Sequence, residues 1–255
     1  MTQSRQRKTA AILAIGDELL SGRTRDANIH YLAGWLTERA IALVEARIVA
    51  DDEAAIVENL NALRARYDYV FTSGGIGPTH DDITVDAIAA AFCAPVVEHP
   101  KAIEMIAAWY RARGEEVTPA RRRMARTPEG AVLIDNPVSG APGVRVANVF
   151  VMAGVPRIFQ GMLNAIEGEL ERGVQMFARA LTAPGLPESR IADGLRDIQA
   201  TFKGVALGSY PIDGDVKGVT VVARAEDQKI ADEAIEAVRA AMGALGVVPV
   251  DADRK

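Results

Sequence analysis

The sequence contains one cysteine, Cys93, among its 255 residues. A single cysteine cannot form an internal disulfide, so nothing in the chain indicates an oxidising compartment or a cysteine-based metal site. The three histidines, His30, His80 and His99, lack the spacing of zinc ligands. The first apolar run, at residues 9–15, is too short for a signal-peptide core or a membrane span. We therefore expect a cytoplasmic protein with no membrane partner.

The chain also lacks an excess of basic residues. Its 29 Lys and Arg residues are outnumbered by 34 Asp and Glu residues, which gives a formal net charge of −5. Proteins that hold nucleic acid by bulk charge are basic, so we expect no nucleic-acid partner. The one dense basic cluster is typical of a solvated helix face, and its alternative role is contact with an anionic ligand. The cluster contains Arg121, Arg122, Arg123 and Arg126, of which Arg126 lies nearest in sequence to the candidate site.

Short aliphatic runs alternate with stretches of helical period along most of the chain. Continuous apolar runs are typical of strands buried on both faces. The stretches between them place apolar residues on one helix face, as Ile56, Leu60 and Leu63 do. This alternation predicts a three-layer α/β/α sandwich with a mostly parallel sheet over residues 1–178. The expected strands are residues 10–15, 42–49, 69–73, 131–134 and 149–152.

The pattern changes after a Pro- and Gly-rich stretch at residues 182–187, which we interpret as an interdomain linker. Residues 189–255 then predict a small α+β module with a helix, two strands and a helix in that order. The residues between its two strands, 211–215, are typical of a turn. The expected strands are residues 205–210 and 218–224.

The most informative segment is the glycine-rich loop at residues 72–84, which follows a predicted strand and precedes an Ala-rich helix. Open α/β sheets bind ligands at the carboxyl ends of their strands. The glycines let the backbone approach a ligand closely, and consecutive amides beside a helix N-terminus can hold a phosphate. Hydroxyls and carboxylates follow at Thr79, Asp81, Asp82 and Thr84. The loop therefore predicts an anion site with nearby groups that suit a metal ion.

Other interpretations of this loop fit less well. A tight strand-to-helix turn with an Asp N-cap would explain a bare glycine pair but not the whole pattern. The dinucleotide fingerprint would need glycine where His80 stands, and no Gly-Lys pair exists to form a P-loop. Neither a Rossmann dehydrogenase nor a P-loop NTPase is indicated.

Five ordered motifs resemble the molybdopterin-binding domain family, which includes the MoaB and Mog proteins and the amino-terminal part of CinA, the competence/damage-inducible protein. The resemblance favours the CinA branch and implies the fold predicted above. The motifs occupy residues 14–28, 49–56, 72–84, 136–143 and 150–156.

The resemblance implies that Asp52 and Asp82 are the two functional carboxylates, with Asp81 as a further metal-ligand candidate. Two carboxylates at the ends of adjacent strands suit a divalent cation that bridges to a phosphate. The implied cation is Mg²⁺, Mn²⁺ or Co²⁺. The implied ligand contacts are Asp17, Asn28, Ser73, Gly74, Gly75, Ile76, Gly77, Pro78, Thr79, Asn136, Pro142 and Gly143.

The family offers two kinds of phosphorylated ligand. A CinA-like role implies metal-dependent hydrolysis of the pyrophosphate of ADP-ribose or a related nucleotide. A Mog-like role implies molybdopterin as the ligand. The remaining alternative is a binding or scaffold protein without turnover.

The resemblance also implies that the second module is KH-like and that the protein forms a homo-oligomer. RNA binding does not follow, because the Gly-x-x-Gly at residues 243–246 has no adjacent basic residues and is better explained as a helix cap. CinA proteins continue into a nicotinamide mononucleotide amidase domain where this chain ends at Lys255, so we do not expect amidase activity.

Overall fold

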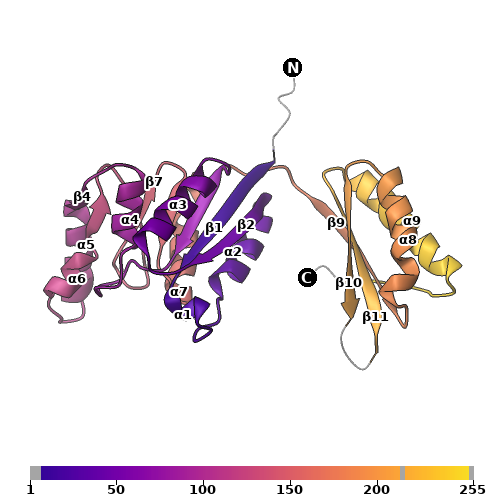
Figure 1. Cartoon of the computed structure of the whole chain (residues 1–255), viewed down its shortest axis with the longest axis horizontal. Coiled ribbons are helices and arrows are strands. Elements are labelled where there is room, and N and C mark those ends of the chain that lie inside the picture. Colours follow the sequence, from indigo (N-terminus) through magenta and orange to yellow (C-terminus); the bar gives the residue numbers. More distant parts are fainter. Residues whose placement is uncertain (1–6, 213–215, 253–255) are drawn as a thin grey trace, which may run out of the picture. The chain divides into compact units, whose positions relative to one another are not determined.

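The structure is a computed structural model that describes residues 7–212 and 216–252. The chain divides into two compact units, Met1–Gly173 and Val174–Lys255, which are shown in Figure 1. The first unit carries the glycine-rich loop and is described first.

The first unit contains a six-stranded sheet in which four neighbouring strands run parallel. Its order is β2-β1-β3-β8-β7-β6. Strands β2, β1, β3 and β8 are mutually parallel, whereas β7 runs antiparallel to both β8 and β6. The strands are β1 (Lys8–Ile15), β2 (Ile41–Val49), β3 (Tyr69–Ser73), β6 (Val132–Ile134), β7 (Gly143–Val146) and β8 (Val149–Met152).

Helices cover both faces of this sheet because β1 is apolar at every position from Ala10 to Ile15. Successive side chains of a strand point to opposite faces. Leu13 and Ile15 accordingly pack with α3 (Glu53–Arg64) and α4 (Thr84–Ala91). Ala10 and Ile12 pack on the other side with α2 (Asn28–Thr37) and α7 (Pro156–Ala165). The predicted three-layer α/β/α sandwich is confirmed.

Several short elements at the edge of the sandwich were not predicted, because three to five residues give no recognisable period. Strands β4 (Val96–Glu98) and β5 (Arg126–Pro128) form a separate antiparallel pair. A small apolar cluster of Ala102, Ile106 and Ala125 lies beneath this pair and the helices near it. The remaining helices of the unit are α1 (Asp17–Leu20), α5 (Pro100–Arg111), α6 (Pro119–Arg123) and the 3-10 turn η1 (Glu167–Glu169).

The second unit is an antiparallel sheet with two helices, as Figure 1 shows. The sheet has the order β10-β11-β9-β12. Helices α8 and α9 bury one face of it through Ile191, Ile235 and Val238. The elements are β9 (Phe177–Pro184), α8 (Glu188–Thr201), β10 (Val205–Ile212), β11 (Gly218–Ala225), α9 (Gln228–Ala244) and β12 (Val250–Asp251).

The linker expected at residues 182–187 is wrong, because its first three residues belong to β9. This strand pairs with β11 along its whole length, and Leu181 and Ala183 are fully buried. Pro184 is tolerated because it is the last residue of the strand. The boundary between the two units lies at Gly173. It comes before residue 178, the expected end of the first domain, and before residue 189, the expected start of the second. Of the expected turn, residues 211 and 212 end β10, and residues 213–215 lie outside the described residues.

In the described parts of both units, none of the helices combines the length and the apolar content that crossing a membrane requires.

Gly173 ends the first unit at a point of close backbone approach, which makes it a sensitive position. A β-carbon there would lie 2.0 Å from the carbonyl oxygen of Ala40, whereas one at Gly168 would meet nothing within 4 Å. We predict that Gly173→Ala lowers the free energy of unfolding by about 1–3 kcal/mol, the usual cost of overpacking. Gly168→Ala is the matched control and should change it by less than about 1 kcal/mol. Urea unfolding measures both, and equal losses would contradict the steric explanation.

Candidate functional site

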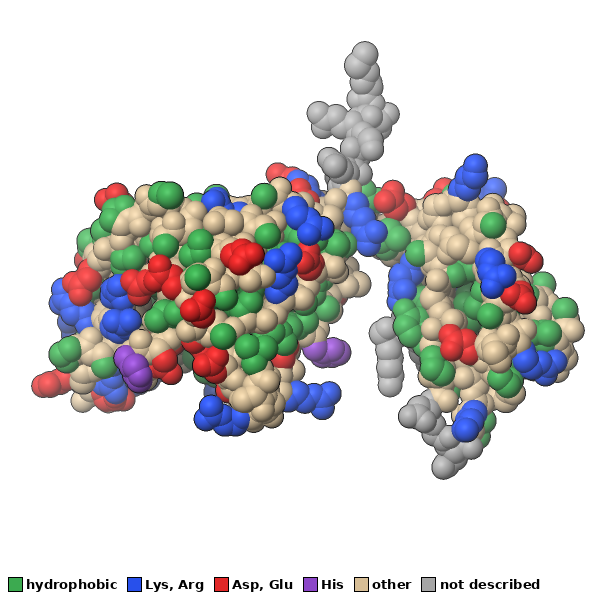
Figure 2. Space-filling view, in the orientation of Figure 1, with side chains coloured by type: hydrophobic (Ala, Val, Ile, Leu, Met, Phe, Trp, Pro, Cys, Tyr) green, Lys and Arg blue, Asp and Glu red, His purple; other side chains and the backbone are tan. Residues whose placement is uncertain are grey.

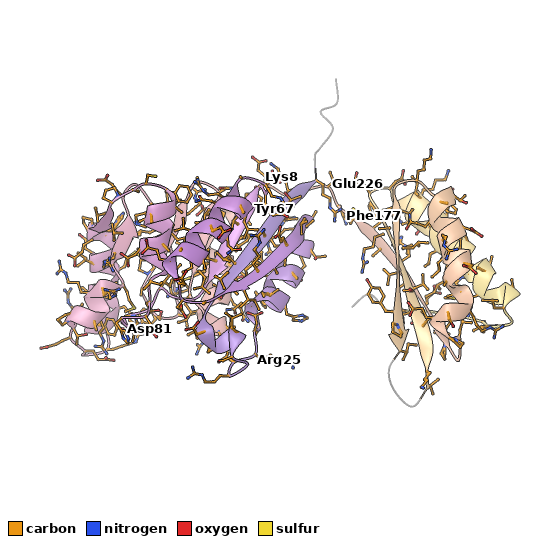
Figure 3. The ribbon with its side chains drawn as sticks, in the orientation of Figure 1. Lys8, Arg25, Tyr67, Asp81, Phe177 and Glu226 are labelled. Carbon is orange, nitrogen blue, oxygen red and sulfur yellow. The ribbon has the colours of Figure 1, made fainter. Side chains whose placement is uncertain are left out.

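A crevice opens between the carboxyl ends of β1 and β3, which are neighbours in the sheet. The chain leaves β1 toward α2 on one face and leaves β3 toward α4 on the other. Loops that diverge in this way leave a crevice at the topological switch point, where α/β sheets bind their ligands. Figure 3 shows Asp81 and Arg25 at this edge of the unit, opposite Lys8, where β1 begins.

The crevice holds a cavity of about 650 Å³. This volume lies within the range of ligand pockets. Apolar residues, carboxylates and glycines make up most of its lining. The lining includes Ile15, Gly16, Glu18, Asp51, Gly74, Gly75, Ile76, Gly77, Pro78, Asp81, Asp82, Tyr110, Met124, Asn136, Gly154 and Met162.

The glycine loop keeps its shape because two of its residues leave no room for a side chain. Gly74 has φ +113, and a β-carbon there would lie 2.1 Å from the carbonyl oxygen of Ile15. Gly75 has φ +66, and its β-carbon would lie 2.1 Å from Oγ1 of Thr84. The buried Thr84 hydroxyl donates to the Gly74 carbonyl at 2.9 Å, and the Thr84 N–H donates to the Gly75 carbonyl at 3.0 Å. The turn is therefore fixed against the first residue of α4.

This shape leaves backbone donors available to a ligand. Within the described residues, the N–H groups of Gly75, Ile76 and Gly77 have no hydrogen-bond acceptor in the protein. All three residues line the cavity. Consecutive unpaired amides can form a concave anion site, so the geometry of the loop is compatible with the predicted phosphate site.

Asn28 and Ser73 lie together behind the loop. The Asn28 side-chain amide donates to the Ser73 hydroxyl and to the Gly154 carbonyl, at 2.7 Å each. It thereby joins the last residue of β3 to the segment that follows β8. Asn28 is 3% exposed, and its Oδ1 has no partner among the described residues although it lines a side pocket of the crevice. A buried acceptor without a donor suits contact with a hydroxyl of a ligand.

The second predicted carboxylate, Asp52, does not line the cavity. Its Oδ1 accepts the Ala55 N–H at 2.8 Å and caps α3. The preceding residue, Asp51, lines the cavity instead, and its Oδ2 accepts the Asp17 N–H at 3.0 Å. As an N-cap, the Asp52 carboxylate turns back toward α3. The side chain of Asp51, one residue earlier, is the one that faces the cavity. Asp17, which was predicted as a ligand contact, thus acts through its backbone N–H, which holds the Asp51 carboxylate.

Asp51 has an unusual electrostatic environment. Burial raises the pKa of its carboxyl, and the N–H of Asp17 opposes that effect. The negative charges of Asp17, Glu18 and Asp81 raise the pKa of Asp51 further. Hydrogen bonding with Thr79 lowers the pKa of Asp81, and His80 contributes in the same direction. The cavity therefore holds carboxyl groups with opposite shifts, a pattern that is enriched at functional sites.

Asp82 lies at the mouth of the glycine loop and holds the loop's last turn. Its Oδ2 accepts the N–H of Thr79 at 2.8 Å and also the Thr79 hydroxyl. A β-carbon on Gly77 would lie 2.7 Å from the same oxygen. Thr79 thus orients the carboxylate, and the structure brings Asp81 and Asp82 to one cavity, as predicted.

The loop at residues 136–143 forms the opposite wall and is ordered mainly by one side chain. Asn136 accepts the N–H groups of Val138 and Ser139, both at 3.1 Å, and donates to the carbonyl of Ala141 at 2.7 Å. These bonds occupy its amide, so Asn136 shapes the wall. Pro142 and Gly143 line an adjoining pocket that shares Ile76, Gly77 and Asp82 with the main cavity.

The carboxylates of the cavity could hold a divalent cation together with a phosphate of the ligand. In the described residues, no three His, Cys, Asp or Glu side chains converge closely enough to hold a metal ion alone. However, Glu18, Asp51, Asp81 and Asp82 line a single cavity with the glycine loop. Mg²⁺ is usually held by one or two carboxylates together with phosphate oxygens of the ligand. The donor set therefore fits a cation whose coordination a phosphate completes.

Sequence reasoning missed several lining residues, including Asp51, Glu18 and Tyr110. A usable signal existed for Asp51. The pattern Asp52-Glu53 directly before the apolar face of a helix is typical of an N-cap and first turn, which favours the preceding residue for the site. Tyr110 lies on α5, far along the chain from the motifs, and no local pattern identifies it.

Comparisons with known proteins support the fold and the motifs. Residues 11–172 match a family described as the probable molybdopterin binding domain, and residues 175–251 match the middle domain of FAD synthase. A protein of Pyrobaculum calidifontis is 33% identical over 90% of this chain and 92% of its own length.

Two further relatives are longer proteins. A probable FAD synthase of Caenorhabditis briggsae is 32% identical over 94% of this chain, and a CinA-like protein of Myxococcus xanthus is 30% identical over 89%. The aligned regions cover 50% and 56% of those proteins, so this chain spans about half their length. Among solved structures, CinA of Thermoplasma acidophilum is 31% identical with a TM-score of 0.59, over 65% of this chain and 99% of that one.

The different surroundings of Asp51 and Asp52 predict opposite effects on stability. At pH 7, Asp51→Asn should raise the melting temperature, because the amide keeps the acceptor for Asp17 and removes a partly buried charge. Since the raised pKa makes the native state bind more protons, wild type gains stability as pH falls through that pKa. The advantage of the variant should therefore shrink on acidification and vanish below the ordinary pKa of Asp.

Asp52 provides the matched pair for this measurement. Asp52→Asn keeps the cap and should leave stability unchanged, whereas Asp52→Ala should cost about 1 kcal/mol. Thermal melts between pH 3 and 8 measure all three variants. A destabilised Asp51→Asn at pH 7 would contradict the assigned burial of the Asp51 charge.

Proposed function

The chain belongs to the molybdopterin-binding domain family and has CinA-like relatives, and from this premise we propose that it is a divalent-metal-dependent hydrolase of the pyrophosphate bond in ADP-ribose or a related dinucleotide. One observation carries the proposal: three unpaired loop amides and four carboxylates line one cavity. The amides can donate hydrogen bonds to a phosphate, and the carboxylates can bind a cation and accept a proton.

The cavity has room for more than a phosphate. Its volume of about 650 Å³ and its apolar side, formed by Ile15, Met124 and Met162, suit a flat base or ring system. Asn28 Oδ1, buried and unpaired, suits a sugar hydroxyl. A nucleoside diphosphate linked to a second group presents all three features, which are phosphates, a flat base and sugar hydroxyls.

The chemistry is the displacement of one phosphate by water. The water oxygen forms a bond to one phosphorus, the bridging P–O bond breaks, and the leaving phosphate takes the bonding electrons. The products from ADP-ribose are AMP and ribose 5-phosphate. Asp51 is the candidate for accepting the proton of the water, because a carboxyl with a raised pKa is a better base.

The remaining groups position the substrate. Asp81 and Asp82 would hold a divalent cation beside the glycine loop, with phosphate oxygens of the substrate completing its coordination. Such a cation would offset the phosphate charge and polarise the P–O bonds. The N–H groups of Gly75, Ile76 and Gly77 would stabilise the charge that develops on the non-bridging oxygens.

The names of the relatives extend the substrate panel. FAD contains the same pyrophosphate linkage as ADP-ribose, and the second unit matches a domain of FAD synthase. The family description also keeps molybdopterin as an alternative ligand, since its phosphate suits the same loop. These candidates share one phosphate site and differ in whether a pyrophosphate is broken.

The decisive experiment measures AMP release from ADP-ribose and FAD, with and without Mg²⁺, Mn²⁺ or Co²⁺. We predict metal-dependent release that Asp82→Asn abolishes. Asp51→Asn should lower kcat by about 100-fold or more, the usual contribution of a general base. Both variants preserve shape and hydrogen-bond acceptors, so circular dichroism melts should show a folded protein.

Asp52→Asn is the matched control, because it keeps the α3 cap and does not face the cavity. It should retain wild-type activity. Loss of activity in Asp52→Asn with full activity in Asp51→Asn would reverse the assignment of the two carboxylates. No release from wild type with any substrate or metal would contradict a hydrolase and favour molybdopterin binding without turnover.

A further inference from the structure

The four arginines of the basic cluster differ sharply in their partners. Basic side chains gather, interleaved with acidic ones, at the end of the first unit that carries α5 and α6 (Figures 1 and 2). Arg121 pairs with Glu115 and donates to the Glu116 carbonyl at 2.7 Å. Arg122 pairs with Glu98 through two nitrogens, at 3.0 and 2.7 Å.

Arg126, the member nearest in sequence to the site, is also neutralised. It forms a two-nitrogen ion pair with Asp86 of α4, one bond of which measures 3.1 Å. Both side chains of this pair are largely buried. The alternative role of the cluster, contact with an anionic ligand, is therefore not favoured for Arg126, because a ligand would have to displace an existing carboxylate.

Arg123 is the member whose charge is left without an acidic partner in the described residues. Its Nη2 lies 3.5 Å from the carbonyl oxygen of Asp82, a long contact that uses little of the guanidinium. Arg123 lines the pocket that shares Ile76, Gly77 and Asp82 with the main cavity. Its charge therefore stands at the mouth of the glycine loop.

We propose that Arg123 binds the pyrophosphate of the substrate beside the glycine loop and is the arginine of the cluster that the site uses. This inference rests on the proposed function for the identity of the substrate. Arginine matches a phosphate with two parallel hydrogen bonds and remains charged at all physiological pH values.

The charges of the cavity explain why such a residue is needed. Glu18, Asp51, Asp81 and Asp82 line the cavity, and its lining among the described residues includes neither lysine nor arginine. A pyrophosphate that enters meets like charges within a few ångströms, which disfavours binding. Arg123, which contacts the loop from α6 through the Asp82 carbonyl, supplies the opposite charge.

The test compares Arg123→Ala with Arg122→Ala, its neighbour on the same short helix. Calorimetric titrations give Kd for each variant. ADP-ribose is titrated in EDTA, and inorganic pyrophosphate is titrated both in EDTA and with Mg²⁺. We predict that Arg123→Ala raises both Kd values by about ten- to a hundredfold, the range for a hydrogen-bonded charge. Arg122→Ala should stay within about twofold of wild type. Arg123→Lys, which keeps the charge but loses the paired geometry, should lie between them.

The outcomes separate this inference from the proposed function. Arginine-dependent binding without AMP release would support Arg123 and reject the hydrolase. AMP release with equal Kd values for Arg123→Ala and Arg122→Ala would support the hydrolase and overturn the role of Arg123. A wild-type protein that binds neither probe would overturn both. Thermal melts establish that each variant is folded before titration.

Discussion

The crevice depends on the close approach of two backbones, the end of β1 and the turn after β3. The Cα of Gly74 lies so near the Ile15 carbonyl that a β-carbon would sit 2.1 Å from its oxygen. The left-handed φ angles of Gly74 and Gly75 turn the chain away from β1, and Thr84 fastens the turned segment to α4 through both its hydroxyl and its N–H. The amides of the next residues are thereby left pointing at open space. Any side chain at Gly74 would separate the strands at the level where the ligand is expected to bind.

The site combines groups that would oppose one another without a ligand. Unpaired amides and Arg123 attract an anion, whereas the carboxylates around Asp51 repel it. The same carboxylates attract a cation, which the amides repel. A phosphate accompanied by a divalent cation satisfies both sets, because each ion screens the other from the groups of like charge. The cavity is therefore complementary to the pair and poorly complementary to either ion alone.

Sequence reasoning succeeded where one dominant pattern decided the outcome. The uninterrupted apolar run at residues 10–15 predicted a strand buried on both faces, and the glycine-rich pattern at residues 72–84 predicted a loop between a strand and a helix. It failed for β9, where Thr182 to Pro184 have turn-like composition but gain a full ladder with β11. It also did not foresee that Asp51 lines the cavity while Asp52 caps α3, since only the directions of their side chains separate these two residues. Arg123 was beyond its reach, because four arginines within six residues differ only in the tertiary partners that they find.

The arginine cluster shows how local ion pairing can select a functional residue. Three of the four guanidiniums have carboxylate partners nearby: Glu115 holds Arg121, Glu98 holds Arg122 and Asp86 holds Arg126. The side chains of these pairs remain partly exposed, and solvent-exposed ion pairs contribute little to stability, about 0–1 kcal/mol each. Their main effect here is to fix where the arginines point. Arg126 lines the same pocket as Arg123 but is paired with Asp86, so Arg123 is the arginine of this pocket that has no carboxylate partner among the described residues. Within the described residues, a basic run that looks uniform in the sequence thus leaves one of its four arginines unpaired beside the glycine loop of an acidic cavity.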